Sequence, residues 1–187
     1  MKKIAAIMVA LMMLPALTAK AQEYKYEAKF GWYPIDLMDL VFMLGEYPDS
    51  GYTAGPVKTV GVFAADFDVK MKNWLTLGAK VSYRNTWREL SATIDGIEYT
   101  DVDRMQGFSV MPTVKFTTGY DSIFRYYATL GLGAGMDLSN GARNGFCAFQ
   151  FTPVGIAIGK KLSWYFEMGL GLAYTGMLTG LSWRFLT

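Results

Sequence analysis

The sequence of 187 residues predicts an all-β protein, a closed eight-stranded antiparallel up-and-down transmembrane β-barrel. The first observation is the stretch 163–174, SWYFEMGLGLAY, in which large apolar residues alternate with glycine, alanine and one glutamate. A period of two is that of a strand, and glycine makes a poor water-facing surface. The second observation is that 52% of all residues are hydrophobic, although residues 22–187 contain no apolar run long enough for a spanning helix. Alternating apolarity suits a barrel in lipid.

Residues 1–21 are interpreted as a cleaved signal peptide. A basic pair, Lys2-Lys3, precedes an apolar run at 4–14, and residues 19–21 (Ala-Lys-Ala) fit a small-residue cleavage site. An N-terminal membrane anchor is the alternative, but the run is shorter than the roughly 20 residues that a spanning helix needs. Residues 22–187 are expected to form one barrel domain. Their 15 basic and 16 acidic residues give no nucleic-acid-binding charge pattern.

Eight alternating segments are expected to be the strands. They are 22–33, 57–71, 74–88, 104–117, 124–136, 145–158, 163–174 and the segment from 176 to 185. The polar stretch 89–103 is expected to interrupt the third and fourth strands. Pro112 and Pro153 are expected to mark bulges, because proline removes a ladder donor. At Pro153 the apolar set of residues also changes phase.

The connections between these segments sort by length. Those near Asn73, Asp121 and Lys160 are short, whereas those after the first, third and fifth strands are longer. Short periplasmic turns and longer outer loops are typical of outer-membrane barrels, so both ends of the domain are expected in the periplasm. Trp164 is expected in the periplasmic aromatic girdle and Tyr174 in the outer one.

Charged residues recur on the face opposite the apolar one, and are expected to form an ionic network that fills the lumen. The predicted members are Glu27, Asp66, Asp68, Lys80, Arg84, Lys115, Arg125, Glu167 and Arg184. Lys25 and Lys29 share this face in the first segment. The mixed signs favour pairing, because an unpaired buried charge is costly; a narrow conduit is the alternative. Arg184, on the adjacent last strand, is the expected partner of Glu167.

The outer loop 34–55 is too apolar for a solvated connection and is the candidate interaction loop. Its apolar residues include Ile35, Leu37, Met38, Val41 and Phe42. Four of them, all except Leu37, share one side at helical spacing. The segment could form a short helix on the membrane or the rim, a docking site for a partner, or a lid over the mouth.

Catalysis is not expected. The sequence contains no histidine, the usual proton shuttle beside a serine or water nucleophile. Asp66 and Asp68 form a same-face carboxylate pair, but side chains fill an eight-stranded lumen and leave no substrate pocket. The single Cys147 has no internal disulfide partner. No catalytic residue, cofactor or metal ligand is therefore predicted.

Four segments carry a resemblance to a known family. They are WLTLGAKVSY (74–83), LGLGAGMDL (130–138), FQFTPVGIAIGKKL (149–162) and LSWRF (181–185). With them the chain resembles the small eight-stranded outer-membrane β-barrel proteins of Gram-negative bacteria, of the outer membrane protein X and OmpA transmembrane-domain type. It is most similar to uncharacterised barrels of the Bacteroidota. The resemblance implies assembly by the barrel-assembly machinery, which commonly reads a terminal aromatic residue; here Phe185 lies two residues from the end.

The expected function is non-enzymatic. A monomeric barrel with a filled lumen, surrounded by outer-membrane lipid and lipopolysaccharide, would serve membrane integrity or contact an unknown surface partner through its outer loops. A narrow channel or small-solute conduit is the first alternative. A soluble, secreted lipocalin-like barrel is the second, but it would need polar residues outward, where Trp164, Phe166 and Leu170 are expected.

Overall fold

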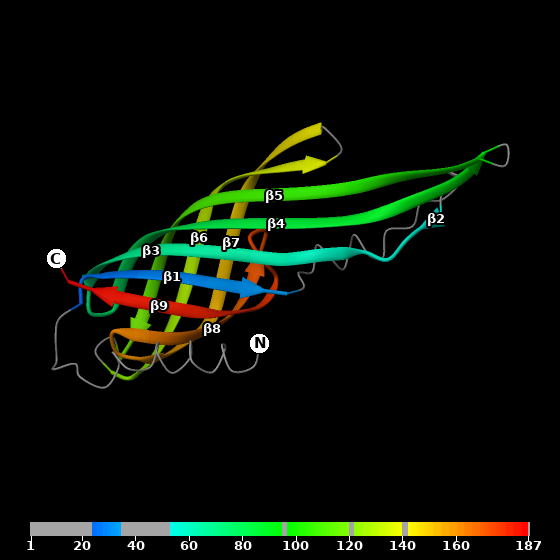
Figure 1. The fold of residues 1–187 in the computed structure, drawn as a ribbon. Helices are drawn as coiled ribbons and strands as arrows, with labels where there is room; N and C mark the ends of the chain where they lie inside the picture. The colour runs from blue at the N-terminus through cyan, green and yellow to red at the C-terminus, as the bar shows by residue number, and fades with distance from the viewer. Residues whose placement is uncertain (1–23, 35–52, 95–96, 120–121, 140–141, 187) are drawn as a thin grey trace, which may run out of the picture.

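The computed structural model describes residues 24–34, 53–94, 97–119, 122–139 and 142–186. Nine antiparallel β-strands run through these residues (Figure 1). They are β1 (Tyr26–Tyr33), β2 (Thr53–Ala54), β3 (Lys58–Lys72), β4 (Leu75–Ile94), β5 (Ile97–Thr118), β6 (Phe124–Ser139), β7 (Ala142–Gly159), β8 (Leu162–Gly171) and β9 (Gly176–Phe185). The described part of the chain contains no helix that is both long and apolar enough to cross a membrane.

Eight of the strands form a ring. Neighbours pair in the order β4-β3-β1-β9-β8-β7-β6-β5, and a further pairing between β4 and β5 joins the two ends of this series. The expected all-β antiparallel sheet and ring of eight strands are therefore confirmed. The ninth strand, β2, is an addition of two residues that pair with Leu90 and Ser91 on the edge of β4.

The ring has two distinguishable ends. The tight connections β3–β4 and β7–β8 and the short connection β5–β6 lie at one end, which we call the turn end. The start of β1 and the end of β9 lie there too, because Lys25 N donates to Phe185 O at 3.3 Å. From the opposite end, which we call the hairpin end, β4 and β5 project well beyond the ring (Figure 1).

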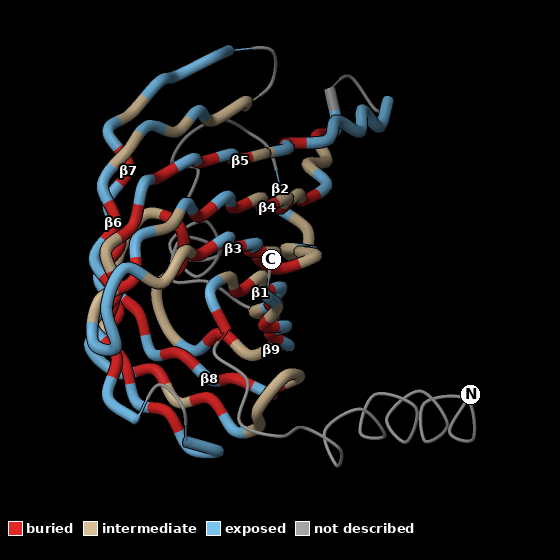
Figure 2. The backbone as a smooth tube through the Cα atoms, turned by 90° about the vertical axis from the view of Figure 1, so that its left-hand side faces the viewer, coloured by how far each residue is buried: buried red, intermediate tan, exposed pale blue. Residues whose placement is uncertain are grey.

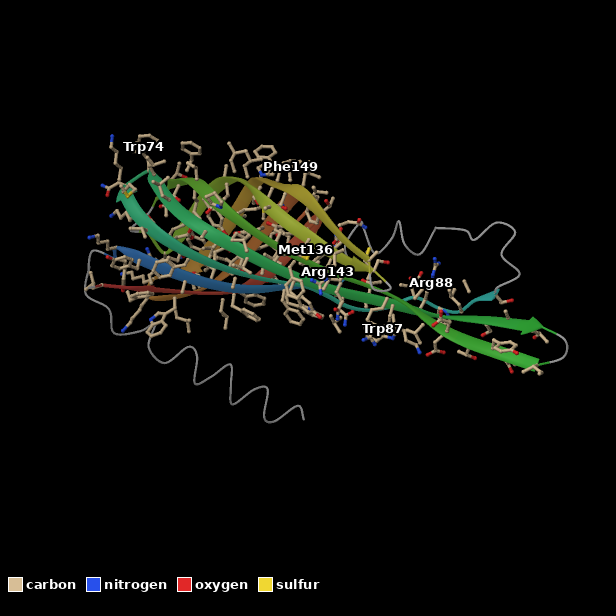
Figure 3. The ribbon with its side chains drawn as sticks, turned by 90° about the horizontal axis from the view of Figure 1, so that it is seen from above. Trp74, Trp87, Arg88, Met136, Arg143 and Phe149 are labelled. Atoms are coloured by element: carbon tan, nitrogen blue, oxygen red, sulfur yellow. The ribbon has the colours of Figure 1, made fainter. Side chains whose placement is uncertain are left out.

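The two faces of the strands differ in polarity. Along β6, Leu130 and Leu132 are exposed on the outside of the ring, whereas Arg125, Tyr127 and Thr129 are buried inside it. Figure 2 shows the same alternation of buried and exposed residues around the ring, and Figure 3 shows aromatic side chains such as Trp74 and Phe149 on its outer side. The period of two thus sorts large apolar residues outward and polar ones inward.

Apolar side chains are also buried inside the ring. Val62, Ala173, Tyr174 and Leu178 are each at most 1% exposed and belong to one cluster. Ala173 and Tyr174 come from the connection between β8 and β9, which folds inward. The interior therefore contains apolar packing as well as charged residues.

The polar stretch 89–103 does not interrupt the strands, so this prediction was wrong. The β4–β5 register runs without a shift from Leu75↔Phe116 to Ile94↔Ile97. A two-stranded ribbon satisfies backbone groups whatever the polarity of its side chains, and β-branched residues such as Thr93 and Val102 favour it. The result is the long hairpin in Figures 1 and 3.

The two prolines behave differently. At Pro153 the β7–β8 register shifts between Phe151 and Val154, and the β6–β7 register shifts at the same place, so the predicted bulge is confirmed. At Pro112 the predicted bulge was wrong. The β4–β5 ladder passes through Ala79↔Pro112 without a shift, and the β5–β6 ladder keeps its register on both sides of the residue. The missing donor therefore leaves the strand alignment unchanged.

The sequence alternation also fails at the start of β1. Tyr24 is 5% exposed and Lys25 is exposed, the reverse of the predicted inward position of Lys25. Both residues precede β1, where the backbone has not yet entered the regular alternation. The predicted signal peptide at 1–21 and the loop residues Ile35, Leu37, Met38, Val41 and Phe42 lie outside the described residues.

Candidate functional site

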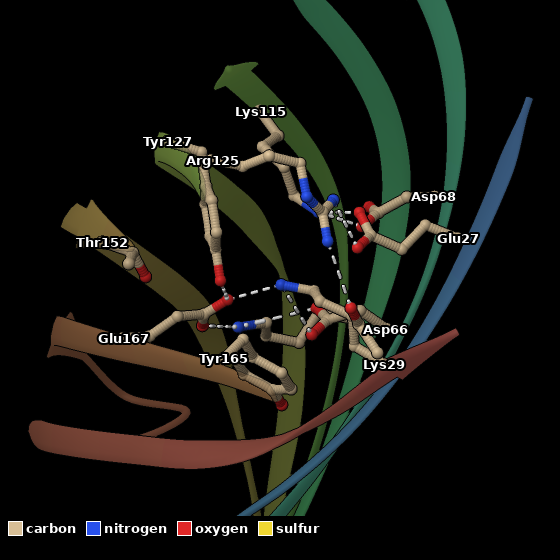
Figure 4. Close-up of polar contacts among 12 residues, drawn as sticks. Glu27, Lys29, Asp66, Asp68, Lys115, Arg125, Tyr127, Thr152, Tyr165 and Glu167 are labelled. Atoms are coloured by element: carbon tan, nitrogen blue, oxygen red, sulfur yellow. Dashed lines mark hydrogen bonds and ion pairs between the residues drawn. The ribbon is translucent and has the colours of Figure 1, made fainter. Parts of the chain in front are cut away.

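All nine predicted lumen residues are buried inside the ring, each with at most 5% of its surface exposed. Seven of them, all except Arg84 and Arg184, gather in one network with Lys29 (Figure 4). The eight members comprise four carboxylates and four cations. They fall into two groups that we call the Glu167 cluster (Lys29, Asp66, Lys80, Glu167) and the Glu27 cluster (Glu27, Asp68, Lys115, Arg125).

The Glu167 cluster spans the interior of the ring. Lys29 of β1 and Lys80 of β4 both reach across to Glu167 of β8, with Lys80 Nζ 3.1 Å from Oε2. Each lysine also lies 3.5 Å from an oxygen of Asp66 on β3. Two carboxylates and two ammonium groups thus balance one another. Because Glu167 is fully buried, these contacts replace the water that a carboxylate otherwise requires.

Two tyrosines complete the contacts of Glu167. Tyr127 OH donates to Oε1 at 2.9 Å and Tyr174 OH donates to Oε2 at 2.8 Å. Together with the two lysines, four donors therefore surround one carboxylate. Charge-assisted hydrogen bonds of this kind are stronger than neutral ones.

The Glu27 cluster lies nearer the turn end. Glu27 and Asp68 are direct neighbours across the β1–β3 ladder, so two carboxylates face inward side by side. Lys115 Nζ contacts both, at 3.4 Å from Glu27 and closer to Asp68. Arg125 Nη1 donates to Glu27 Oε1 at 2.8 Å, and its Nη2 donates to Ser163 Oγ at the same distance. The two cations offset the repulsion between the carboxylates.

Tyr127 separates the two clusters. Its ring lies 4.9 Å from Lys29 Nζ and 5.2 Å from Lys115 Nζ, so it contacts one cation from each cluster through its π-system. Glycine makes the space for it. A Cβ at Gly155 would clash with the Tyr127 ring, so only glycine fits opposite this side chain.

The strand register explains why some of these charges meet. Lys29 pairs with Asp66 across β1–β3, and Asp66 pairs with Lys80 across β3–β4. These three inward residues therefore form a row of alternating charge on one wall. Glu167 projects from β8, which is two strands from β1 and four strands from β4, and the narrow ring brings it within reach of both lysines.

The two remaining arginines lie apart from this network. Arg84 Nη2 lies 2.9 Å from Asp137 Oδ1 toward the hairpin end. Arg184 lies at the turn end, where its Nε donates to Lys160 O at 2.5 Å and its guanidinium lies 4.6 Å from the Tyr24 ring centre. The predicted pairing of Arg184 with Glu167 was wrong. In the β8–β9 register Glu167 faces Leu178, and Arg184 is six residues farther along β9.

Tyr174 was also misplaced by sequence reasoning. Instead of lying in an outer girdle it is fully buried, because β8 ends at Gly171 and the chain then turns into the ring. Its backbone N–H donates to Gln150 Oε1 at 3.2 Å, and its hydroxyl lies 3.0 Å from Thr152 Oγ1. Tyr127 and Tyr165 were correctly placed on the inward face. The phenol group of Tyr127, which is expected to find a partner in a charged interior, was the signal for its missed contact with Glu167.

The charged side chains of the two clusters are engaged with one another. Every cation of the two clusters contacts a carboxylate, and the largest members of the network are fully buried. A hollow between Ser82, Arg84 and Phe146 is too small for a water molecule. Within the described residues, no three His, Cys, Asp or Glu side chains are grouped as metal ligands.

Comparison with protein-family models and with curated proteins finds no match for this sequence.

Proposed function

We propose that the chain is a non-enzymatic transmembrane β-barrel of the Gram-negative outer membrane, monomeric, with a filled lumen. The observation that carries this proposal is the polarity of the ring. Outward-facing Leu132, Trp164 and Leu170 are 63%, 64% and 55% exposed, whereas inward-facing Arg125 and Glu167 are at most 2% exposed. In water such a surface would be a large exposed apolar patch, but in lipid it is the favourable arrangement.

The distribution of aromatic residues supports the same proposal. Trp74, Trp164 and Trp183 are exposed near the turn end, whereas Trp32 is exposed near the hairpin end. Aliphatic residues such as Leu132 lie between them. Aromatic belts on either side of an apolar band are typical of proteins that cross a membrane, because amphipathic rings favour the interface with water.

A filled lumen agrees better with these contacts than a conduit does. The two clusters place paired charges across the interior, and the inward-folded Tyr174 packs above Glu167. Opening a path would require separating buried ion pairs, which is costly. With no histidine in the sequence, catalysis by the usual proton shuttle is also disfavoured. The role proposed is therefore membrane integrity or surface interaction, in contact with lipid and lipopolysaccharide.

The surface-interaction part of this role is supported by the projecting hairpin. Beyond the ring it exposes Ile97, Tyr99 and Val102, at 58%, 51% and 44%. The predicted interaction loop 34–55 leaves the ring at the same end, since it follows β1 and precedes β3. The hairpin would then extend into the medium outside the cell, where it would contact the unknown surface partner.

The membrane assignment is tested by folding and fractionation. The protein should fractionate with the outer membrane and migrate differently on a gel before and after heating, because closed membrane barrels resist detergent until heated. A protein that remains in the soluble periplasmic fraction without a heat-dependent shift would overturn the proposal. Planar-bilayer recording tests the filled lumen: no stable single-channel conductance is expected, and reproducible ion-selective steps would favour the narrow channel.

Orientation is tested by inserting an epitope tag at either end. A tag between Ile94 and Ile97 should be accessible to antibody on intact cells. A tag between Lys160 and Lys161 should become accessible only after the outer membrane is permeabilised. The reverse result would place the hairpin end in the periplasm and remove the basis for surface interaction.

A further inference from the structure

The turn end carries exposed positive charge that the buried network does not use. Lys25 and Lys72 are exposed, and Lys160 and Lys161 are partly exposed. We refer to these four residues as the turn-end lysines. They come from the start of β1, the end of β3 and the tight β7–β8 connection. None of them forms an ion pair with a described carboxylate.

Backbone hydrogen bonds hold Lys161 and Lys25 along one arc of the rim, and the arc continues to β3, which carries Lys72. Lys161 O accepts from Arg184 N at 2.8 Å, which ties the β7–β8 connection to β9. Phe185 O accepts from Lys25 N at 3.3 Å, and Lys25 O accepts from Lys70 N at 2.8 Å, which continues the arc through β1 to β3. The lysines therefore lie on adjacent strands in the order β8-β9-β1-β3 rather than scattered around the ring.

Aromatic residues lie directly beside this arc. Tyr26 stacks with Phe67 at 6.0 Å and with Phe185 at 5.7 Å between ring centres. Lys25 Nζ lies 5.6 Å from the Tyr26 ring centre, and Lys72 Nζ lies 5.7 Å from that of Trp74, which Figure 3 labels at this end. These ammonium groups lie just beyond aromatic side chains. In a membrane, a lysine in this position keeps its aliphatic stem in the apolar region and extends its charge into the headgroup region.

The opposite end has a different charge pattern. Exposed Lys58, Arg104 and Arg143 lie there, but so do exposed Glu89, Glu98 and Asp101, and Lys58 pairs with Glu89 at 2.7 Å. At the turn end the nearest described carboxylates, Glu27 and Asp68, are buried and already paired. The sequence adds only Glu23 and Asp121 near the connections of this end. Positive charge is therefore in excess at the turn end.

From these observations we propose that the turn-end lysines form a binding surface for anionic phospholipid headgroups in the adjoining membrane leaflet. This inference rests on the proposed membrane-spanning function and names the lipid class that one rim would select. The lysines lie where the apolar belt ends, so their natural ligand is the charged group of a lipid whose chains contact that belt. Phosphate oxygens would accept hydrogen bonds from the ammonium groups without displacing any described ion pair.

The test measures lipid selectivity around the folded protein in vesicles of zwitterionic phosphatidylcholine. Spin-labelled phosphatidylglycerol and spin-labelled phosphatidylcholine are compared by the fraction of each that is motionally restricted at the protein surface. One lysine near an anionic surface increases association about fivefold, so a preference of about that size for phosphatidylglycerol is expected. The preference should fall in 1 M salt, where the screening length is about 3 Å.

A matched pair of variants locates the effect. The turn-end triple variant Lys72→Gln, Lys160→Gln, Lys161→Gln should lose most of the preference. The hairpin-end triple variant Lys58→Gln, Arg104→Gln, Arg143→Gln removes the same formal charge and should keep it. Equal losses in both variants would show a general charge effect and overturn the proposal.

Other outcomes separate the inference from the function on which it rests. Absence of any restricted lipid would mean that the protein is not in the bilayer, which refutes the proposed function. Restricted lipid without headgroup preference would refute only the lysine surface. Binding of soluble polyphosphate to the protein in phosphatidylcholine vesicles, without lipid preference and lost in the turn-end variant, would assign the lysines to a soluble polyanion and overturn the lipid proposal.

Discussion

Replacing Glu167 with glutamine should destabilise the folded protein strongly. Glu167 is fully buried and accepts from Lys29, Lys80 and two tyrosine hydroxyls. Glutamine keeps the size of the side chain but removes the negative charge. Lys29 and Lys80 would then share Asp66 alone, which is 3.5 Å from each.

The size of the destabilisation follows from the charge imbalance that the substitution leaves in the Glu167 cluster. The Glu167 cluster changes from two carboxylates and two cations to one carboxylate and two cations. Removing one partner of a buried ion pair leaves an uncompensated charge, which costs about 3–5 kcal/mol. A folded domain has about 5–15 kcal/mol of stability in total, so we expect Glu167→Gln to shift the urea unfolding midpoint far below that of the wild type.

The control is Glu89→Gln, which breaks an ion pair of the same chemistry at the surface. Lys58 and Glu89 are 2.7 Å apart, but their side chains are 48% and 52% exposed. Because water screens such a pair, its loss should cost about 0–1 kcal/mol. Unfolding of both variants is measured in vesicles by tryptophan fluorescence and by loss of the unheated gel band.

A double variant separates charge balance from packing. Adding Lys80→Met to Glu167→Gln leaves Lys29 and Asp66 as a balanced pair, so the double variant should be more stable than the sum of the two single effects predicts. The reasoning would be refuted if Glu167→Gln cost less than about 1 kcal/mol, or if the two effects added without coupling. Either result would mean that the buried charges do not depend on one another.

Two further predictions test the inward-folded connection and the apolar belt. Tyr174→Phe removes a buried hydroxyl that contacts Glu167 and Thr152, so it should lower the free energy of unfolding in urea by about 1–3 kcal/mol. The control, Tyr99→Phe on the exposed hairpin, should change this free energy little. Equal effects would argue against the buried position of Tyr174. Leu132→Arg places a charge in the belt and should cost about 2–4 kcal/mol in a bilayer, whereas Ile97→Arg, at a similarly exposed position beyond the ring, should be nearly neutral. A neutral Leu132→Arg in vesicles would contradict a lipid-facing belt.

The sequence was sufficient to predict which side of each strand faces inward. Because alternation has a period of two, one clear strand such as 163–174 indicates what the two faces contain, and the remaining strands repeat it. Lys80, Lys115 and Arg125 could therefore be placed inside from pattern alone, and all three are buried. The bulge at Pro153 could also be predicted, because the apolar residues switch from one face of the strand to the other within this segment.

The partners of these residues could not be predicted in the same way. Glu167 was matched to Arg184 because the two strands are adjacent, but adjacency does not fix the stagger between them. In the register, Arg184 lies six residues beyond the position facing Glu167, about 20 Å along the strand. The true partners come from strands that are not adjacent to β8: Lys29 lies on β1, two strands away, and Lys80 lies on β4, four strands away across the closed ring.

Tyr174 shows a second limit of sequence pattern. Its alternation with Leu170 and Leu172 continues that of β8, so the sequence gives no sign that the strand ends at Gly171. What decides its position is the space inside the ring. A Cβ at Gly169 would clash with the Tyr174 ring. The absence of a side chain at Gly169 therefore provides the space that Tyr174 occupies.

The balanced interior has a consequence for the surface. Each buried cluster contains two carboxylates and two cations, so the two clusters contribute no net charge. Any difference in electrostatic potential between the two ends must then come mainly from residues outside the two clusters. At the turn end those residues include buried Arg184 and the lysines Lys25, Lys72, Lys160 and Lys161. If the lipid proposal holds, the balanced clusters leave the exposed turn-end lysines as the groups that would select anionic headgroups.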